Sequence, residues 1–465
     1  MDINMSELTR RQFLETAAAV AASGPAFAQA RPARPNIIFI LADDLGYGDV
    51  GCYGQKRIKT PNIDRLAAEG TRFTQAYSGS TVCAPSRGVL MTGKHTGHST
   101  VRGNKNPELP VRPDEPTLGT VMKSAGYKTA LFGKWGLGGP ETESLPNQRG
   151  FDEFFGYLNH WHAHLAYPEH IWENRRELLL FDNWFNRRKT YVPDLFMERT
   201  LKFIEQHGKE PFFIYLSPTV PHANNELMQV QPNAIEVPDQ GPYAGENWPD
   251  VEKNFAASIT RMDASIGRIL SLLKQKRLDE NTLILFTSDN GPHKEGGHNP
   301  EFFGSRGPLR GLKRDLYEGG IRVPTIARWP GKIVPGATSD FQWAFWDLLP
   351  TFAEAAGARA PAGLDGMSVM PALLGKNQKP HECLYWEFHE GGFQQALRQG
   401  DWKLVRQAPK FEVELFNLKD DIGETRNVAA RYPEVRARLE KIFREARTES
   451  EWWPSSGRKP SFQER

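Results

Sequence analysis

The chain has 465 residues, with 58 Lys or Arg against 56 Asp or Glu, so its formal net charge is only +2. That balance argues against nucleic acid or an anionic membrane surface as the main partner, because both select basic chains. The length exceeds the roughly 250–300 residues at which single cores stop growing, so we expect one large domain and a smaller one.

The first residues predict a cleaved export signal. Residues 9–14, Thr-Arg-Arg-Gln-Phe-Leu, resemble a twin-arginine motif, and residues 26–28, Ala-Phe-Ala, offer a cleavage site. The alanine-rich run between them is too short to span a bilayer. We therefore expect residues 1–30 to be a signal peptide, no membrane span, and a mature protein in the bacterial periplasm or outside the cell. An ordinary amphipathic first helix is the alternative.

The mature chain opens with a strand that ends in two acids. Residues 36–41, Asn-Ile-Ile-Phe-Ile-Leu, form a continuous apolar run typical of a central parallel strand, and Asp43 and Asp44 follow it. α/β sheets bind ligands beyond the carboxyl ends of their strands, so this placement indicates a site. Solvated acids in a turn are the alternative.

Residues 80–94 place a cysteine at a helix start. Pro85 suits the first helical turn and Gly93 ends the helix, so Cys83 would lie at the N-terminus beside the Arg87 cation. Such a corner is electropositive and suits an oxyanion. The alternative is that Cys83 is a small buried hydrophobe, which is the commoner role of a lone cysteine.

The chain has three cysteines, Cys52, Cys83 and Cys383, an odd and sparse set that predicts no disulfide framework. A single Cys52–Cys83 bridge, or a bridge from Cys383, stays open. Residues 83–87, Cys-Ala-Pro-Ser-Arg, followed by residues 92–94, Thr-Gly-Lys, resemble the signature of the type I sulfatases of the alkaline phosphatase superfamily. In that family the cysteine is oxidised to formylglycine, an aldehyde whose hydrate attacks sulfur. The resemblance implies that Cys83 is the nucleophile's precursor and that a formylglycine-generating enzyme is a partner during maturation.

A helix at residues 116–125 and a strand at residues 127–132 lead to a second motif. Residues 133–138, Gly-Lys-Trp-Gly-Leu-Gly, resemble the sulfatase element G-K-W-H-L-G, which gives Lys134 an active-site role. Gly136 replaces the family's frequent histidine. One catalytic imidazole is therefore unaccounted for.

Residues 150–174 are dense in aromatic side chains and histidines, with no metal-like spacing. A packed structural loop and a substrate pocket are equal alternatives. We expect the loop to line the pocket mouth and to bind substrate, with His164 supplying the missing imidazole and His162 as the second candidate.

Two further strands repeat the pattern of polar residues at a strand end. His222 follows residues 212–216, and the resemblance places it near the leaving group. Asp289 and Asn290 follow residues 282–288 and match the family's D-N-G. Related zinc phosphatases and phosphonate hydrolases tend to have histidine here, and a carboxamide oxygen suits a harder cation.

Residues 313–324 resemble the family's K-x-x-x-x-E-G-G-x-R-x-P segment, so Lys313 would face the sulfate. Asp43, Asp44, Asp289 and Asn290 supply only oxygen. With bidentate carboxylates and an oxygen on modified Cys83, they reach the roughly 6–8 ligands that Ca²⁺ takes.

The remaining elements complete the expected architecture. Helices are predicted near residues 194–207, 255–273, 347–357 and 432–447, and short antiparallel strands near residues 383–388, 401–405 and 413–418. The resemblance implies an α/β, alkaline phosphatase-like sandwich: a large mixed sheet between helices in a catalytic domain at residues 34–375. A C-terminal subdomain at residues 376–465 would add a short antiparallel sheet and a terminal helix.

The resemblance implies a sulfuric ester hydrolase that acts on aryl sulfates and sulfated sugars. A phosphate or phosphonate monoester hydrolase of the same superfamily is the alternative. A non-catalytic binding protein would normally have lost ligands, yet the cysteine, the cations and all four metal residues are present.

Overall fold

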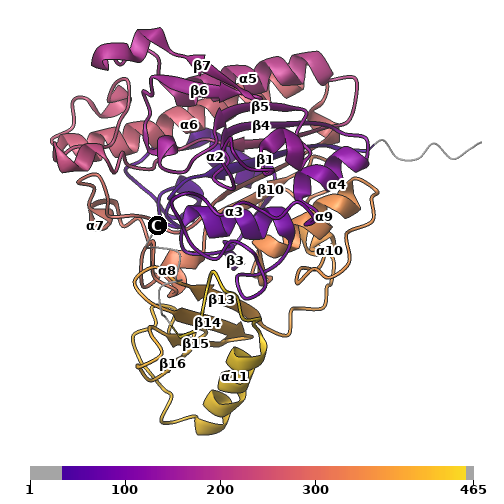
Figure 1. The fold of residues 1–465 in the computed structure, drawn as a ribbon, viewed down its shortest axis with the longest axis vertical. Helices are drawn as coiled ribbons and strands as arrows, with labels where there is room; N and C mark the ends of the chain where they lie inside the picture. The colour runs from indigo at the N-terminus through magenta and orange to yellow at the C-terminus, as the bar shows by residue number, and fades with distance from the viewer. Residues whose placement is uncertain (1–33, 457–465) are drawn as a thin grey trace, which may run out of the picture. The chain divides into compact units, whose positions relative to one another are not determined.

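The computed structural model describes residues 34–456, of which residues 35–456 belong to one compact unit. The predicted signal peptide, residues 1–30, lies outside the described residues. The centre is a mixed ten-stranded sheet (Figure 1). Its strands, in spatial order, are β11 (Ala337–Ser339), β2 (Thr71–Phe73), β10 (Thr325–Arg328), β9 (Thr282–Ser288), β1 (Asn36–Ala42), β8 (Phe212–Ser217), β4 (Lys128–Lys134), β5 (Glu153–Tyr157), β6 (His170–Glu173) and β7 (Arg176–Leu179).

The five strands β9, β1, β8, β4 and β5 run parallel at the centre of this sheet. Every residue of β1 is buried, because helices cover both faces and a continuous apolar sequence is then favoured over alternation. All five carboxyl ends lie at the same edge. That edge is where the predicted site residues emerge.

Alternate residues of β1 enter two different cores. Ile37, Phe39 and Leu41 pack with one set of helices, and Ile38 and Ile40 pack with the other. The first set is α3 (Cys83–Thr92), α4 (Leu118–Ser124), α9 (Leu348–Ala355) and α10 (Met370–Leu373). The second set is α2 (Pro61–Ala68), α5 (Val192–His207) and α6 (Asp250–Gln275). The large sheet is therefore sandwiched between helical layers, as the resemblance implied.

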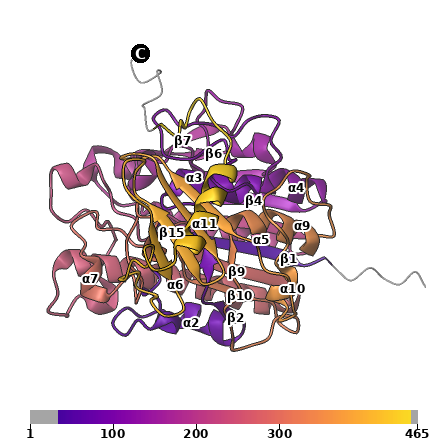
Figure 2. The ribbon, with the colours of Figure 1, turned by 90° about the horizontal axis from the view of Figure 1, so that it is seen from below.

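A separate antiparallel sheet forms near the C-terminus, with strands β13 (Leu384–Phe388), β14 (Gln394–Gln399), β15 (Trp402–Arg406) and β16 (Glu414–Asn417). One face packs on the large core, where Trp386 meets Trp346 at 5.3 Å between ring centroids. The other face is covered by α11 (Pro433–Glu445) through Leu439 and Phe443, as Figure 2 shows. The predicted small C-terminal layer is confirmed.

Six strands of the large sheet and one of the small sheet escaped the sequence analysis: β2, β5, β6, β7, β10, β11 and β14. β5, β6 and β7 lie within or just after the aromatic stretch, where tryptophan and histidine obscure any alternation. β14, Gln-Gln-Ala-Leu-Arg-Gln, has no β-branched or aromatic residue and is held by its neighbours β13 and β15. The fold also contains a two-stranded sheet of β12 (Trp343–Ala344) and β3 (Ala76–Tyr77) and the one-turn helices α7 (Pro300–Phe303) and α8 (Glu318–Ile321).

No helix within residues 34–456 is long and apolar enough to cross a membrane. Cys52, Cys83 and Cys383 are all free thiols.

A buried ion pair joins the small C-terminal sheet to helix α8. Lys403 of β15 donates to Glu318 of α8 at 2.7 Å, and neither side chain is exposed. We expect Lys403→Met to lower the free energy of unfolding by about 3–5 kcal/mol, since it leaves a buried carboxylate without this partner. Urea unfolding checks this.

The matched control is Lys441→Met on α11, whose pair with Glu445 is long and exposed, at 3.9 Å. It should change the free energy of unfolding very little. Equal effects of the two substitutions would contradict a role for the buried pair.

Candidate active site

Four oxygen-bearing side chains meet at the carboxyl edge of the sheet. Asp43 and Asp44 follow β1, and Asp289 and Asn290 follow the neighbouring strand β9. The Asp44 backbone N–H donates to Asp289 Oδ1 at 3.1 Å, and Asn290 Nδ2 donates to Asp44 Oδ1 at 2.7 Å. Asp44 has a left-handed backbone, with φ of 68°, a strained conformation of the kind that often marks a functional site.

The arrangement of these oxygens fits a cation. All four side chains are fully buried, and Asp43 Oδ1 and Asn290 Oδ1 have no hydrogen-bond partner among the described residues. Buried polar atoms are rarely left unpaired. Burial and the neighbouring Asp43 carboxylate raise the pKa of Asp289 to about 7, which reflects the crowding of negative charge. An all-oxygen donor set with two unused oxygens suits a hard cation such as Ca²⁺.

Cys83 is the first residue of α3, as predicted, and its side chain faces a cavity. Its Sγ lies 3.7 Å from Asn104 Oδ1, which also accepts from the Ala84 N–H at 3.1 Å. Burial raises the pKa of the Cys83 thiol, so the unmodified side chain is not a ready thiolate nucleophile.

Arg87 lies one turn into α3 and holds the carboxylates together. Its Nε and Nη2 both donate to Asp289 Oδ2, at 3.1 and 2.7 Å, and Nη2 lies 3.4 Å from Asp43 Oδ2. Nη1 donates to the Lys134 carbonyl at 3.0 Å and to the Ser217 hydroxyl. A fully buried guanidinium with this many partners has a fixed position.

Two lysines complete the positive side of the site. Lys134, the last residue of β4, donates to Asp43 Oδ2 at 2.8 Å. Lys313 donates to Asp44 Oδ2 at 2.8 Å and to Glu295 Oε2 at 2.9 Å. Burial raises the pKa of both aspartates on its own, yet the lysine cations lower the pKa of Asp43 and of Asp44 below the usual value.

His222 has a defined tautomer. Its Nδ1 lies 2.6 Å from the Ala223 carbonyl and must donate, which leaves Nε2 to accept from Lys313 at 3.0 Å. Burial, together with the Lys313 cation, holds the pKa of His222 well below its usual range. The imidazole is therefore neutral, with Nε2 directed at Lys313 and at Asp44 Oδ2, 3.4 Å away.

Above this cluster lies a cavity of about 770 Å³. Its lining includes Cys83, His222 and Lys313 at the cluster and, further out, Asn104, Glu108, His160, Trp161, His164, Arg314, Glu390 and Trp452. A cavity of this size suits a small organic ligand.

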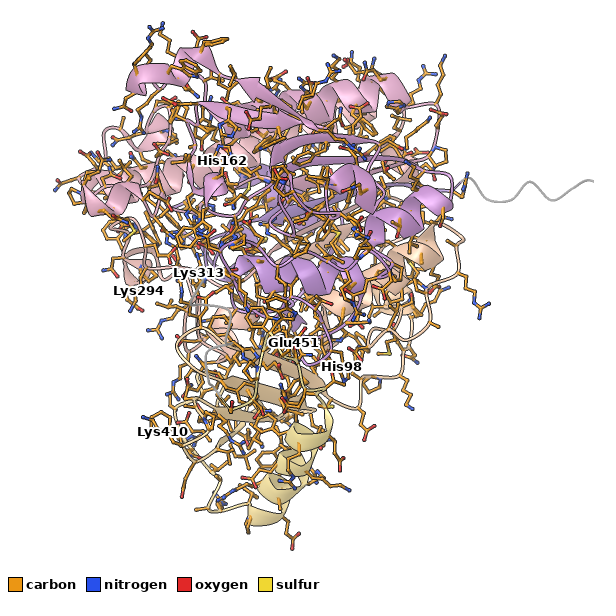
Figure 3. All side chains as sticks on the ribbon, viewed as in Figure 1. His98, His162, Lys294, Lys313, Lys410 and Glu451 are labelled. Carbon is orange, nitrogen blue, oxygen red and sulfur yellow. The ribbon has the colours of Figure 1, made fainter. Side chains whose placement is uncertain are left out.

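The structure separates the two histidines proposed from the aromatic stretch. His164 lines the cavity, and its ring stacks on His222 at 4.6 Å between centroids. His162 packs instead against His170, at 4.3 Å, and Tyr157, at 5.1 Å. Figure 3 labels His162 and Lys313, which come from separate parts of the chain around the sheet.

The geometry also identifies cavity residues that sequence reasoning missed. Gly136 has φ of +72°, which disfavours any side chain, and a Cβ there would lie 3.7 Å from His160 Cβ. His160 Nδ1 contacts Glu108 at 2.7 Å. Asn104, Glu108 and Glu295 lie in irregular loops without periodicity, so no sequence signal marks them.

Comparison with known proteins places this geometry in a family. The Sulfatase family model matches residues 35–358, and a model of the N-sulphoglucosamine sulphohydrolase C-terminal region matches residues 312–449. The chain belongs to the sulfatase family. It is 32% identical to N-acetylgalactosamine-6-sulfatase of Canis lupus familiaris over 399 residues, covering 80% of this chain and 72% of the relative. It is 34% identical to arylsulfatase A of Bos taurus over 401 residues, with the same coverage.

Solved structures agree with this assignment. The crystal structure of Ps i-CgsB matches with a TM-score of 0.77 and 30% identity over 92% of this chain and 94% of that one. A second structure of that protein is in complex with k-i-k-neocarrahexaose. This sulfatase is therefore a sulfuric ester hydrolase with the alkaline phosphatase-like fold.

The two histidines of the aromatic stretch give a matched pair of variants. We expect His164→Ala to lower kcat/KM on sugar sulfates by roughly 10²–10⁴-fold if its imidazole takes part in proton transfer. The effect on an activated aryl sulfate should be smaller, because a good leaving group needs less help. Steady-state kinetics on both substrates check this.

His162→Ala is the control, since its half-buried ring packs against His170 and Tyr157 and does not line the cavity. It should leave kcat/KM unchanged on both substrates and lower the melting temperature. If His164→Ala behaves in the same way, the stretch has only a structural role.

Proposed function

We propose that this sulfatase hydrolyses sulfate monoesters through a formylglycine made from Cys83, with Ca²⁺ held by Asp43, Asp44, Asp289 and Asn290. One observation carries the proposal: Cys83 and Lys313 line the same cavity, and Lys313 belongs to a buried cluster of three carboxylates with the cations Arg87 and Lys134. Two oxygens of this cluster have no hydrogen-bond partner among residues 34–456. That set of groups suits a nucleophile attacking an anionic ester.

The oxygen of modified Cys83 would complete the cation's ligand set. When bound, Ca²⁺ would polarise the nucleophile's oxygen and the sulfate oxygens. Formylglycine hydrate would supply two hydroxyls: one would attack sulfur as the S–O bond to the leaving alcohol breaks, and deprotonation of the other would expel sulfate by C–O cleavage and restore the aldehyde.

Charge explains why three cations are needed. Three carboxylates with one divalent cation leave a net charge of −1, which would repel a sulfate ester anion. Arg87, Lys134 and Lys313 reverse that sign. Fixed cations in a site without bulk water stabilise the charge on the transferring SO₃ group more strongly than water does.

His222 is our candidate for the acid that protonates the leaving oxygen. Its Nδ1 bond to the Ala223 carbonyl fixes the ring, and its Nε2 receives a hydrogen bond from the Lys313 ammonium. Because the neutral Nε2 carries no proton of its own, the proton would come from the Lys313 ammonium, pass through Nε2 to the leaving oxygen, and be restored to Lys313 from water. His164, stacked on His222, would bind substrate beside it and supply the imidazole missing at Gly136.

We propose a sulfated sugar as the natural substrate, with aryl sulfates also accepted. The relative named N-acetylgalactosamine-6-sulfatase and the complex of Ps i-CgsB with k-i-k-neocarrahexaose support a carbohydrate. The cavity adds aromatic faces, Trp161 and Trp452, on which a sugar ring can stack.

The proposal includes maturation and location. A formylglycine-generating enzyme would modify Cys83 before twin-arginine export to the periplasm or beyond. The catalytic domain would span residues 34–375 and the C-terminal subdomain residues 376–465.

A phosphate or phosphonate monoester hydrolase is the second candidate, because that chemistry uses the same fold. Asn290 argues against it, since a carboxamide oxygen suits zinc less well than imidazole. The nitrogen of His222 that could bind a metal also already accepts from Lys313.

The test compares matched sulfate and phosphate esters, using protein whose residue 83 has been identified by peptide mass spectrometry. We expect formylglycine at position 83 and a higher kcat/KM on the sulfate ester. Cys83→Ala should abolish turnover and preserve the fold, because the thiol opens onto the cavity.

The Cys83→Ala variant should give a circular dichroism spectrum like that of the parent protein. Active protein that contains only an unmodified or disulfide-bonded Cys83 would contradict the formylglycine proposal. Faster turnover of the phosphate ester would favour the second candidate.

The calcium site makes a separate prediction. Chelation should inactivate the protein, and added Ca²⁺ should restore activity. Asn290→Ala should weaken calcium binding measured by titration calorimetry, because it removes one oxygen ligand. Asn225→Ala, in the cavity wall, is the control and should bind calcium as the parent does. Stoichiometric zinc in active protein would contradict the assignment.

A further inference from the structure

Two charged side chains form a pair at the outer part of the active-site cavity. Arg314 follows Lys313 in the chain, and its Nε donates to Glu390 Oε2 at 3.2 Å. Its Nη1 donates to Glu295, the residue that also holds Lys313. Arg314 and Glu390 both line the cavity, and their side chains are 45% and 28% exposed. A ligand bound at Lys313 therefore has this pair beside it.

The backbone at Arg314 is strained and firmly held. Its φ is +78°, a conformation that is uncommon for a residue other than glycine. The Arg314 N–H donates to the Thr81 carbonyl at 3.1 Å, and the Lys313 N–H donates to the Pro292 carbonyl at 2.9 Å. Strain of this kind persists only where the surroundings fix it, and it gathers at ligand-binding sites.

The charges indicate which group the pair would bind. The Arg314 guanidinium already forms ion pairs with the carboxylates of Glu295 and Glu390. These two carboxylates would repel a second sulfate group on the substrate. A hydroxyl both donates and accepts a hydrogen bond. A guanidinium N–H donates a hydrogen bond and the neighbouring carboxylate oxygen accepts one, so together they match adjacent hydroxyls of a sugar ring.

We infer that Arg314 and Glu390 form a subsite that binds hydroxyl groups of the sugar ring, next to the carbon that carries the sulfate. This inference rests on the proposed function, because it takes Lys313 as the sulfate end of the site. Glu390 lies between β13 and β14. The C-terminal sheet therefore takes part in choosing the substrate as well as covering the core.

The experiment compares 4-nitrophenyl sulfate with a panel of galactose and N-acetylgalactosamine monosulfates, including the 4-deoxy analogue of the 6-sulfate. The variants are Glu390→Ala and Arg314→Asn, since asparagine tolerates the left-handed backbone. Arg306→Asn, whose ion pair with Glu301 lies outside the cavity, is the control.

We expect each subsite variant to lower kcat/KM on the preferred sugar sulfate by ~10–100-fold, the loss of one or two charged hydrogen bonds. The loss on 4-nitrophenyl sulfate should be far smaller, because the aryl ring has no hydroxyl to bind. The preference for a sugar over its deoxy analogue should also shrink in both variants, while Arg306→Asn behaves as the parent.

Three outcomes would overturn the inference. Equal losses on aryl and sugar sulfates would mean that the pair only supports the loop. A parent protein that hydrolyses 4-nitrophenyl sulfate but no sugar in the panel would refute the subsite and leave the sulfatase chemistry intact. No turnover of either class by protein containing formylglycine would refute the proposed function and the subsite together.

Discussion

The buried ion pairs at the carboxyl edge of the sheet are the constraint on which the rest of the structure depends. Asp43, Asp44 and Asp289 emerge from adjacent parallel strands, and each buried carboxylate would cost several kcal/mol without a partner. Arg87 spans two of them, and a lysine pairs with each of Asp43 and Asp44. The pairing requires α3, β4 and the Lys313 loop to pack against one edge of the sheet. The same ion pairs therefore stabilise the packing of these elements and fix the side chains of the candidate site.

The small C-terminal sheet extends this arrangement. Its Lys403 pairs with Glu318, five residues after Lys313, and Glu318 also accepts from the Tyr77 hydroxyl at 2.7 Å. Glu318, in the segment that follows Lys313, is thus held both by β15 of the C-terminal sheet and by β3. A lysine on an irregular loop needs such support to keep a fixed position, because the loop itself supplies no repeating hydrogen bonds.

The sequence allowed those parts of the site to be predicted that follow a strong local pattern. Asp43, Asp289 and His222 come after continuous apolar strands, and Cys83 starts a helix with clear boundaries, so their convergence followed from parallel-sheet topology. Asn104, Glu295 and Glu390 come from irregular loops that meet only in three dimensions. β14 was missed for a related reason, since its pairing and not its composition makes it a strand.

The two ends of the cavity face different physical demands. In the proposed function the inner end would hold a tetrahedral sulfate, and the groups there are buried, with their positions determined by paired charges. The outer end must distinguish one ring from another, and it is built from loops and from half-exposed side chains such as Arg314. Loop residues can change without disturbing the buried carboxylates. In the proposed function, the same buried charged groups would act on different sulfate esters, and the loop residues at the outer end of the cavity would determine which ester binds.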